Sequence, residues 1–203
     1  TPLKRWTLSA PWSLDLDLPR QQLTMGDLCL GSQGASLCVK GSQVSAAQGS
    51  LEFALNEFDL KRLRPWLPDN FRWQAVLSAD GRASWRGNQP TLHARVSTTP
   101  GTLVADEIKT EYQRLELGVD FERQQAAIRL DFASRQIGNI DTDLLIKEPA
   151  GPGLLSGQLK FDDLKLATFA PLIPEVRSLQ GFISADARFD GTLAAPLLYG
   201  ELN

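Results

Sequence analysis

The chain has 203 residues, of which 42% are hydrophobic and 22% charged, and its formal net charge is −3 at pH 7. These ordinary globular values argue against disorder. The mild acidity and the lack of a Lys- or Arg-rich run argue against a nucleic-acid partner. No apolar stretch approaches the ~18 residues that a membrane-spanning helix needs, and the length suits one large all-β domain or two small ones.

The first strand signal is an alternation of leucine and aspartate over residues 14–18. An apolar–polar period of two predicts a half-buried β-strand. Leu14, Leu16 and Leu18 would then share the apolar face of that strand.

Residues 29–38 are typical of a β-hairpin with Gln33-Gly34 as a two-residue turn. This register places Cys29 opposite Cys38 at a non-hydrogen-bonded pair, where the Cα atoms are about 4.5 Å apart and can be bridged. The apolar residues of the hairpin occupy the opposite face; they are Leu28, Leu30, Leu37 and Val39.

We therefore expect an outer-face disulfide that contributes roughly 2–3 kcal/mol. It would indicate an oxidising compartment, and two reduced thiols are the alternative. We expect no zinc site, because two cysteines and one distant histidine do not make one.

A further strand is predicted where Leu51, Phe53 and Leu55 alternate with other residues. The alternation then stops at residues 59–68, where leucines follow a capping aspartate at helical spacing. This pattern predicts a short helical turn ended by proline, with an irregular loop as the alternative. Residues 163–174 show the same features.

That similarity belongs to a longer internal repeat. The tripeptide Ser78-Ala79-Asp80 recurs as Ser184-Ala185-Asp186 at an offset of 106 residues (186 minus 80). Self-similarity at a fixed offset is typical of elongated, repetitive architectures, which usually offer a continuous surface rather than one catalytic pocket. We predict a single elongated β fragment with two related units at about 51–97 and 157–203.

The clearest hairpin lies at residues 115–132. If Phe121 faces Ala126, every apolar residue of one strand faces an apolar residue of the other. The pattern predicts an antiparallel pair with one wet and one apolar face. Its apolar residues are Leu115, Leu117, Val119, Phe121, Ile128, Leu130 and Phe132, and Arg129 on the wet face lies diagonal to Glu116 and Asp120. A weaker strand signal follows at 144–146, and turns are predicted at 97–101, 138–139 and 148–153.

No residue pattern indicates catalysis. The sequence lacks a Gly-x-Ser-x-Gly elbow, a phosphate-binding glycine loop and a histidine cluster. The lone His93 alternates with apolar neighbours, as an ordinary strand residue does. Asp80 and Asp186 are expected to pair with Arg82 and Arg188 on the wet face. We therefore expect no enzyme, no cofactor and no metal.

A longer set of residues is similar to a known family. It comprises Gly157-Gln158-Leu159, Leu164, Leu166, Phe169-Ala170-Pro171-Leu172-Ile173-Pro174-Glu175-Val176, Leu179-Gln180-Gly181, Ser184-Ala185-Asp186, Arg188, Gly191-Thr192-Leu193, Pro196, Leu198 and Gly200. These residues resemble the C-terminal region of the TamB family, the translocation and assembly module subunit of Gram-negative bacteria. The cysteine hairpin also resembles that region.

The resemblance implies a periplasmic segment of a longer protein that is anchored in the inner membrane and reaches the outer membrane. It implies an elongated, folded-over antiparallel or mixed sheet with a hydrophobic groove, called a β-taco, and short helical turns. It also implies the outer-membrane barrel protein TamA as a partner. The chain begins at Thr1 and ends at Asn203 within a strand-like pattern, so we expect a fragment whose targeting information lies elsewhere.

Three functions fit these observations: a conduit for phospholipid acyl chains that supports outer-membrane biogenesis, a chaperone-like groove that pairs with unfolded outer-membrane protein strands, and a structural spacer with a closed core. Alternation alone does not separate an open groove from a closed core. The first function is favoured. The residues predicted to line the groove are Leu14, Leu16, Leu18, Leu28, Leu30, Leu37, Val39, Leu51, Phe53, Leu55, Leu115, Leu117, Val119, Phe121, Ile128, Leu130, Phe132, Leu159 and Phe161.

Overall fold

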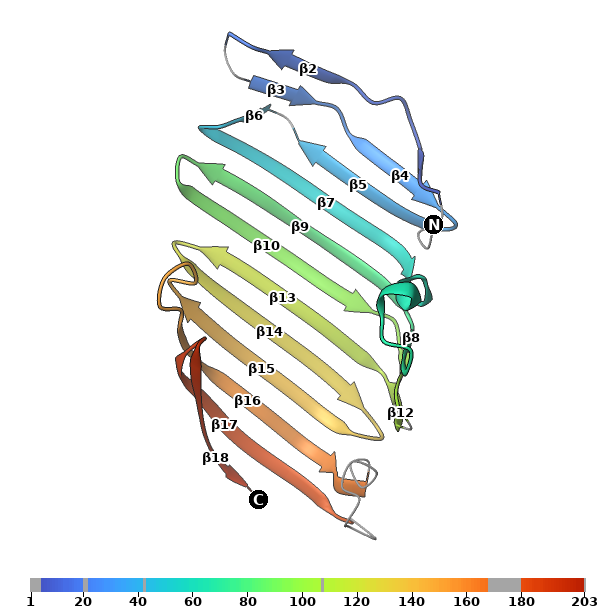
Figure 1. Ribbon diagram of the computed structural model, residues 1–203, viewed down its shortest axis with the longest axis vertical. Coiled ribbons are helices and arrows are strands. Elements are labelled where there is room, and N and C mark those ends of the chain that lie inside the picture. The colour runs from blue at the N-terminus through green and yellow to red at the C-terminus, as the bar shows by residue number, and fades with distance from the viewer. Residues whose placement is uncertain (1–4, 20–21, 42, 107, 168–179, 203) are drawn as a thin grey trace.

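One open antiparallel sheet of twelve strands dominates the fold in a computed structural model of the chain (Figure 1). The structure describes residues 5–19, 22–41, 43–106, 108–167 and 180–202. The strands follow the order β1 (Thr7–Leu8), β4 (Leu28–Ser32), β5 (Ala35–Gly41), β7 (Gln48–Asp59), β9 (Val76–Arg86), β10 (Gln89–Thr98), β13 (Arg114–Glu122), β14 (Gln125–Ser134), β15 (Gly138–Lys147), β16 (Leu154–Lys165), β17 (Phe182–Thr192) and β18 (Ala195–Leu202). The prediction of an elongated all-β sheet is confirmed.

The predicted hairpin registers are also confirmed. Cys29 lies opposite Cys38 around the Gln33-Gly34 turn, where both residues have positive φ, as this kind of turn requires. Phe121 lies opposite Ala126 and Leu117 opposite Leu130, as the alternation indicated.

Two small sheets accompany the large one. The first contains β2 (Leu14–Asp17), β3 (Gln22–Met25) and β6 (Gln43–Ser45) at the β4 end of the molecule (Figure 1). The second contains β8 (Phe71–Gln74), β11 (Gly101–Ala105) and β12 (Ile108–Tyr112), and is called the flap below. The flap strands continue β9, β10 and β13 in the same lateral order, so the flap is a bent extension of the large sheet.

The predicted helical turn is present as a 3-10 helix, η1 (Leu60–Trp66). Asp59 caps it, accepting a hydrogen bond from the backbone N–H of Lys61 at 2.9 Å. Trp66 is 53% exposed, so it does not anchor the segment. Leu60 anchors it instead, because its side chain is fully buried. The predicted second helical turn falls largely within residues 168–179, outside the described ranges.

The internal repeat is also visible in the strand boundaries. Adding 106 to the first and last residue numbers of β7 and β9 gives those of β16 and β17. Register shifts between Leu55 and Phe58 on β7 and between Phe161 and Leu164 on β16 occupy equivalent positions. Glu57 and Asp163, which share this offset, both have positive φ.

The turn prediction at residues 138–139 is wrong by a few positions. The chain reverses at 135–137, and Gly138 already pairs with Ser134 at the start of β15. The backbone of β16 lies so close to Gly138 that an added Cβ would come within 2.6 Å of the Asp163 carbonyl oxygen. Glycine is needed here because two strands approach each other closely. The local sequence does not distinguish such a glycine from one in a turn.

Candidate functional site

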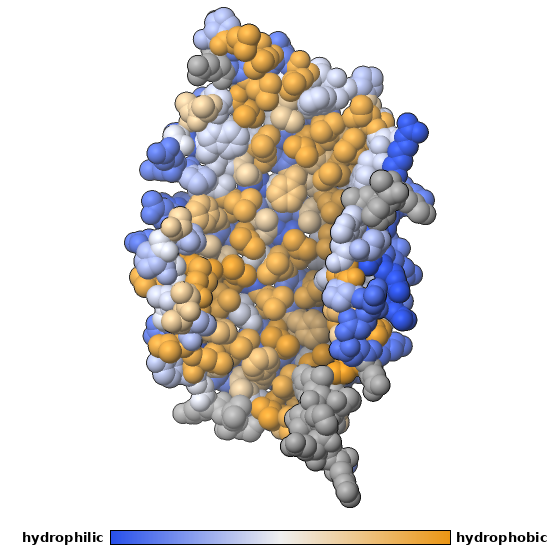
Figure 2. Space-filling model, viewed as in Figure 1, coloured by the Kyte–Doolittle hydropathy of each residue, from blue (hydrophilic) through white to orange (hydrophobic). Residues whose placement is uncertain are grey.

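The large sheet presents a continuous apolar face. Residues that lie directly opposite one another on adjacent strands form rows across this face. One such row comprises Val39, Phe53, Gly81, Ala94, Val119, Ile128, Leu144, Gly157 and Phe189. Figure 2 shows hydrophobic side chains gathered over the middle of the sheet, in a hollow bounded on one side by polar residues at the flap. With neighbouring strands about 4.8 Å apart, eleven spacings make this face roughly 50 Å long.

Most of this face is not covered by a second layer. Leu117, Val119, Ile128 and Leu130 in its middle are only half-buried. In the described part of the chain, the buried apolar residues are Ala35, Phe58, Leu60, Tyr112, Ile146, Leu155 and Ala185. A sheet that packed face to face on another would bury its central residues more completely. The middle of the face is therefore open to a ligand.

The packed core lies instead at the flap margin. Phe58, Leu60 and Ala35 form a cluster that includes Trp73 of the flap. Tyr112, 2% exposed, places its ring 5.8 Å from that of Phe132 on the large sheet. The flap therefore folds over one margin of the apolar face.

Hydrogen bonds hold this bend. The indole Nε1 of Trp73 donates to the Tyr112 hydroxyl oxygen at 2.9 Å, and Thr98 Oγ1 donates to the same oxygen at 3.0 Å. Nearby, Ser134 Oγ donates to the Glu111 carbonyl at 2.7 Å. Buried polar groups that are satisfied in this way stabilise a single arrangement.

The helical turn η1 joins the flap margin to the cysteine hairpin. Arg62 Nη2 donates to the carbonyl oxygens of Ser32 and Gln33, both at 2.9 Å. Its guanidinium also lies over the Phe58 ring, 5.6 Å from the centroid. The tip of the hairpin is thereby fixed to the margin.

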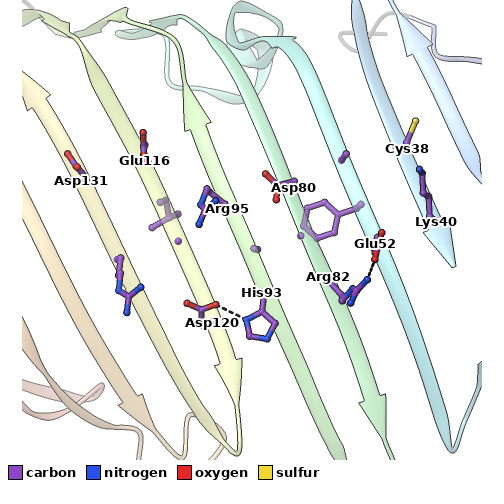
Figure 3. A pocket seen from close by; sticks show the side chains of 17 residues that line it. Cys38, Lys40, Glu52, Asp80, Arg82, His93, Arg95, Glu116, Asp120 and Asp131 are labelled. Atoms are coloured by element: carbon purple, nitrogen blue, oxygen red, sulfur yellow. Dashed lines mark hydrogen bonds and ion pairs between the residues drawn. The ribbon is translucent and has the colours of Figure 1, made fainter.

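The opposite face of the sheet is wet and charged. Side-chain contacts join neighbouring strands. His93 Nδ1 is hydrogen-bonded to Asp120 Oδ1 at 2.7 Å (Figure 3), and Arg129 Nε forms an ion pair with Asp143 Oδ1 at 3.2 Å. A cavity of about 690 Å³ crosses this face. Exposed pairs of this kind contribute little stability.

One expectation about this wet face is corrected: Arg82 pairs with Glu52 of β7 rather than with Asp80 (Figure 3). Arg129 lies opposite Gly118 and so diagonal to Glu116 and Asp120, as predicted, and its ion-pair partner is Asp143 of β15. Directly opposed residues on adjacent strands have Cβ atoms about 5 Å apart, closer than residues two apart along a strand. The Arg82 guanidinium donates to Glu52 and so holds the pKa of that carboxyl below its ordinary value.

The disulfide between Cys29 and Cys38 is present on this charged face. The two Cα atoms are 4.1 Å apart. An ion pair lies beside it on the same face, with Lys40 Nζ 3.9 Å from Asp27 Oδ2.

The chain matches the family described as TamB, N-terminal domain, over residues 1–203. The chain belongs to the TamB family. No solved structure matches it significantly.

This match corrects the location expected within the TamB family. The residues resemble a C-terminal region, but the match is to the N-terminal domain. A repeated β unit explains the error, because similar strand and turn patterns recur along such proteins and a short motif does not fix its position in the series.

The TamB family works with TamA in the translocation and assembly module and is associated with outer-membrane biogenesis or lipid transport in general. Within the described ranges, no helix is long and apolar enough to cross a membrane. The same residues contain no group of three or more His, Cys, Asp or Glu placed to hold a metal ion.

The structure of this TamB-family chain brings most predicted lining residues together. Those from residue 28 onward lie on the one apolar face of the large sheet. Leu14 and Leu16 lie instead in the small β2 sheet, Leu18 lies beyond β2, and their exposed fractions are 53%, 57% and 72%. The small sheet still adjoins the face, since Met25 opposes Leu14 and approaches Gly41 beside Leu51.

Sequence reasoning missed the middle of the face. Leu92, Ala94 and Val96 of β10 belong to it, and an alternation around His93 could have identified them. On β9 the facing residues are Ala79, Gly81 and Ala83. Such small residues give a weak hydrophobic signal, and here the Phe53 ring lies over Gly81.

Proposed function

We propose that this chain forms part of a periplasmic conduit in which the open apolar face shields phospholipid acyl chains between the inner and outer membranes. One observation carries the proposal: apolar residues, mostly leucine, isoleucine, valine and phenylalanine with alanine and glycine on β9, form a face that runs across the twelve-stranded sheet and whose middle is only half-buried. An exposed apolar area of that extent normally marks an interaction site.

The free-energy gain from shielding an acyl chain is large. Each buried CH₂ contributes about 0.8 kcal/mol, so a chain of about sixteen carbons gains on the order of 12 kcal/mol. Neighbouring rows of the face have similar aliphatic composition, so this gain changes little from row to row. A lipid could then move along the face without meeting a deep energy minimum.

The proposal assigns no catalytic step to the chain. It places the longer protein, anchored in the inner membrane, in the periplasm with TamA as its outer-membrane partner, as is general for the TamB family. Support for outer-membrane biogenesis would follow from delivery of lipid along the face.

A second candidate is a chaperone-like groove for outer-membrane proteins. One observation favours it: among the described strands, β18 pairs only with β17, and Leu197, Leu198 and Tyr199 on it are about half exposed. A free strand edge can pair with an extended polypeptide.

Mass spectrometry of lipids copurified with the 203-residue chain tests the proposal. We expect phospholipid in a fixed ratio to protein, displaced by added fatty acid. A chain that carries no lipid, but protects an unfolded outer-membrane protein from aggregation, would favour the second candidate. A chain that does neither would favour a structural spacer.

A further inference from the structure

Three large apolar side chains are exposed on the charged face of β16 and β18. They are Leu154, Leu197 and Tyr199, with exposed fractions of 47%, 48% and 58%, and each alternates along its strand with residues of the apolar face. Leu193, in the turn between β17 and β18, is 51% exposed, and its backbone N–H donates to the Gly153 carbonyl oxygen at 2.9 Å. Leu154, Leu193, Leu197 and Tyr199 are called the outer patch below.

The internal repeat indicates that the fold does not need apolar side chains at these positions. At the offset of 106 residues, β7, β9 and β10 pair in the same register as β16, β17 and β18. In the first unit the equivalent residues are polar or lack a side chain; they are Gln48, Gly87, Thr91 and His93. The two units therefore share a strand arrangement but differ in what they expose to water, which points to a role other than folding for the outer patch.

The outer patch has the size of a small interaction surface. Four large side chains that are each about half exposed present an apolar area on the order of a few hundred Å², a size that on monomeric proteins is often functional. Leu145 of β15 lies on the same face, is half-buried and extends the patch toward the middle of the sheet. A standard interface buries about 800 Å² on each partner, so the outer patch suits the apolar centre of a weak interface.

Two charges of opposite sign lie beside the outer patch on β17. Arg188, opposite Tyr199, forms no ion pair with any side chain that the structure describes. Asp190, opposite Leu197, accepts a hydrogen bond from the backbone N–H of Gly191 at 2.7 Å, and within the described ranges no cation pairs with it. Two residues apart on one strand, the two charges are separated by about 7 Å. Such a surface complements itself under a twofold rotation, because each charge then meets its opposite.

The net charge around the outer patch also favours a second copy over a strongly charged partner. The cations Lys147 and Arg188 are balanced by the anions Glu148 and Asp190. A partner of large net charge would gain little attraction here, whereas a second copy, whose own patch is equally balanced, is not repelled.

We propose that the charged face of β16–β18 binds the same face of a second copy of this chain, with the strands of the two copies antiparallel. Leu197 of each copy then packs against Tyr199 of the other. Arg188 of each copy pairs with Asp190 of the other. Because the apolar faces of both copies point away from this interface, the inference does not depend on the proposed lipid conduit.

Sedimentation equilibrium of the 203-residue chain tests the inference. We expect a monomer–dimer equilibrium in which the average mass rises with concentration toward twice the monomer mass. The variant Leu197→Thr/Tyr199→His carries the residues of the first repeat unit. It should weaken the dimer by at least about tenfold, because two half-exposed apolar side chains lose their contact. Its Tm should change little, since the equivalent strand of the first unit folds with those residues.

Exchange of the two charges tests the ion pairs separately. Arg188→Asp alone places carboxylates of the two copies against each other and should weaken the dimer by about tenfold or more. Arg188→Asp/Asp190→Arg should restore the dimer, because each charge again meets its opposite. A role of these residues in the folding of the single chain would not produce this restoration.

The matched control is Leu198→Thr, which lies on the same strand but on the apolar face, opposite Phe189. It should leave the dimer unchanged. Equal weakening by this control would show that the copies associate through the apolar face or the free edge of β18, and would overturn the inference. A chain that is still monomeric at about 1 mM, where even a weak complex forms, would overturn it too. Bound lipid, quantified on the same samples, should not change in Leu197→Thr/Tyr199→His, so failure of the dimer and failure of the conduit are distinguished.

Discussion

The substitution Leu130→Asp separates an open face from a closed core. Leu130 lies on β14 between Leu117 and Thr142 of the adjacent strands, in the middle of the apolar face. It is half-buried, whereas Leu60 at the flap margin is fully buried. A carboxylate at residue 130 can therefore keep contact with water, and one at residue 60 cannot.

The expected loss of stability at residue 130 is small. Full burial of a leucine contributes about 1.5–3 kcal/mol, and because part of the Leu130 side chain stays exposed, somewhat less than this, about 1–2 kcal/mol, is lost. The lower strand preference of aspartate adds up to about 1 kcal/mol. For a chain of this size a loss of about 2 kcal/mol lowers Tm by roughly 4–8 °C. Leu60→Asp would bury an unpaired charge at a cost of several kcal/mol, and we expect it to unfold the chain.

Leu130→Asp should weaken lipid binding strongly, although it lowers stability only a little. An acyl chain crossing residue 130 would have to dehydrate the new carboxylate, which costs several kcal/mol. A cost of about 3 kcal/mol weakens binding roughly a hundredfold. We expect a folded variant that carries little lipid and fails to support outer-membrane integrity when introduced into the longer protein.

Thermal unfolding followed by circular dichroism, together with quantification of bound lipid, checks this prediction. Gln158→Asp is the control, because it adds the same charge on the wet face, opposite Arg188. If Leu130→Asp folds and still binds lipid normally, this face is not the lipid path. If it unfolds, the face is a closed core and the spacer function gains support.

Three other predictions concern the parts that hold the face in shape. Reducing the Cys29–Cys38 disulfide should lower the free energy of unfolding by roughly 2–3 kcal/mol, measured by urea unfolding with and without reductant; identical curves would show that the bridge does not constrain the chain. Tyr112→Phe should cost about 1–3 kcal/mol, because Trp73 and Thr98 lose their common acceptor; a variant with wild-type Tm would mean that this hydroxyl does not hold the flap. Glu52→Gln should destabilise the chain more at pH 7 than at acidic pH, because a carboxyl with a lowered folded-state pKa stabilises above its ordinary value of 4.5 and loses that contribution as the pH falls through the folded pKa; an effect that does not decrease with falling pH would contradict the role of its charge.

Much of the fold follows from local sequence. The two-residue turn at Gln33-Gly34 fixes the register of its hairpin, and this register alone brings Cys29 to Cys38. Strict alternation over 115–132 assigns every side chain to a face, because the strand period of two leaves no other arrangement. The capping Asp59 and its spaced leucines likewise locate η1.

Other features depend on contacts between distant strands. Arg82 and Arg129 find their partners on neighbouring strands, which a single strand's sequence does not specify. The small residues Ala79, Gly81 and Ala83 line the apolar face only because their strand is flanked by β7 and β10. Leu14 and Leu16 alternate as clearly as any strand residues, yet they lie in a separate small sheet.

The sequence by itself determined that the chain is all-β, which residues are apolar and which of them share a strand face, because these depend on hydrophobicity and the two-residue period of a strand. Only the tertiary structure decided that the strands form one open sheet, that a flap folds over one margin, and that the middle of the apolar face is left half-buried. The physical reason is that alternation fixes which side of a strand avoids water, but not what covers it. Whether another sheet, a lipid or a partner covers that side depends on how the strands pair and bend over long range.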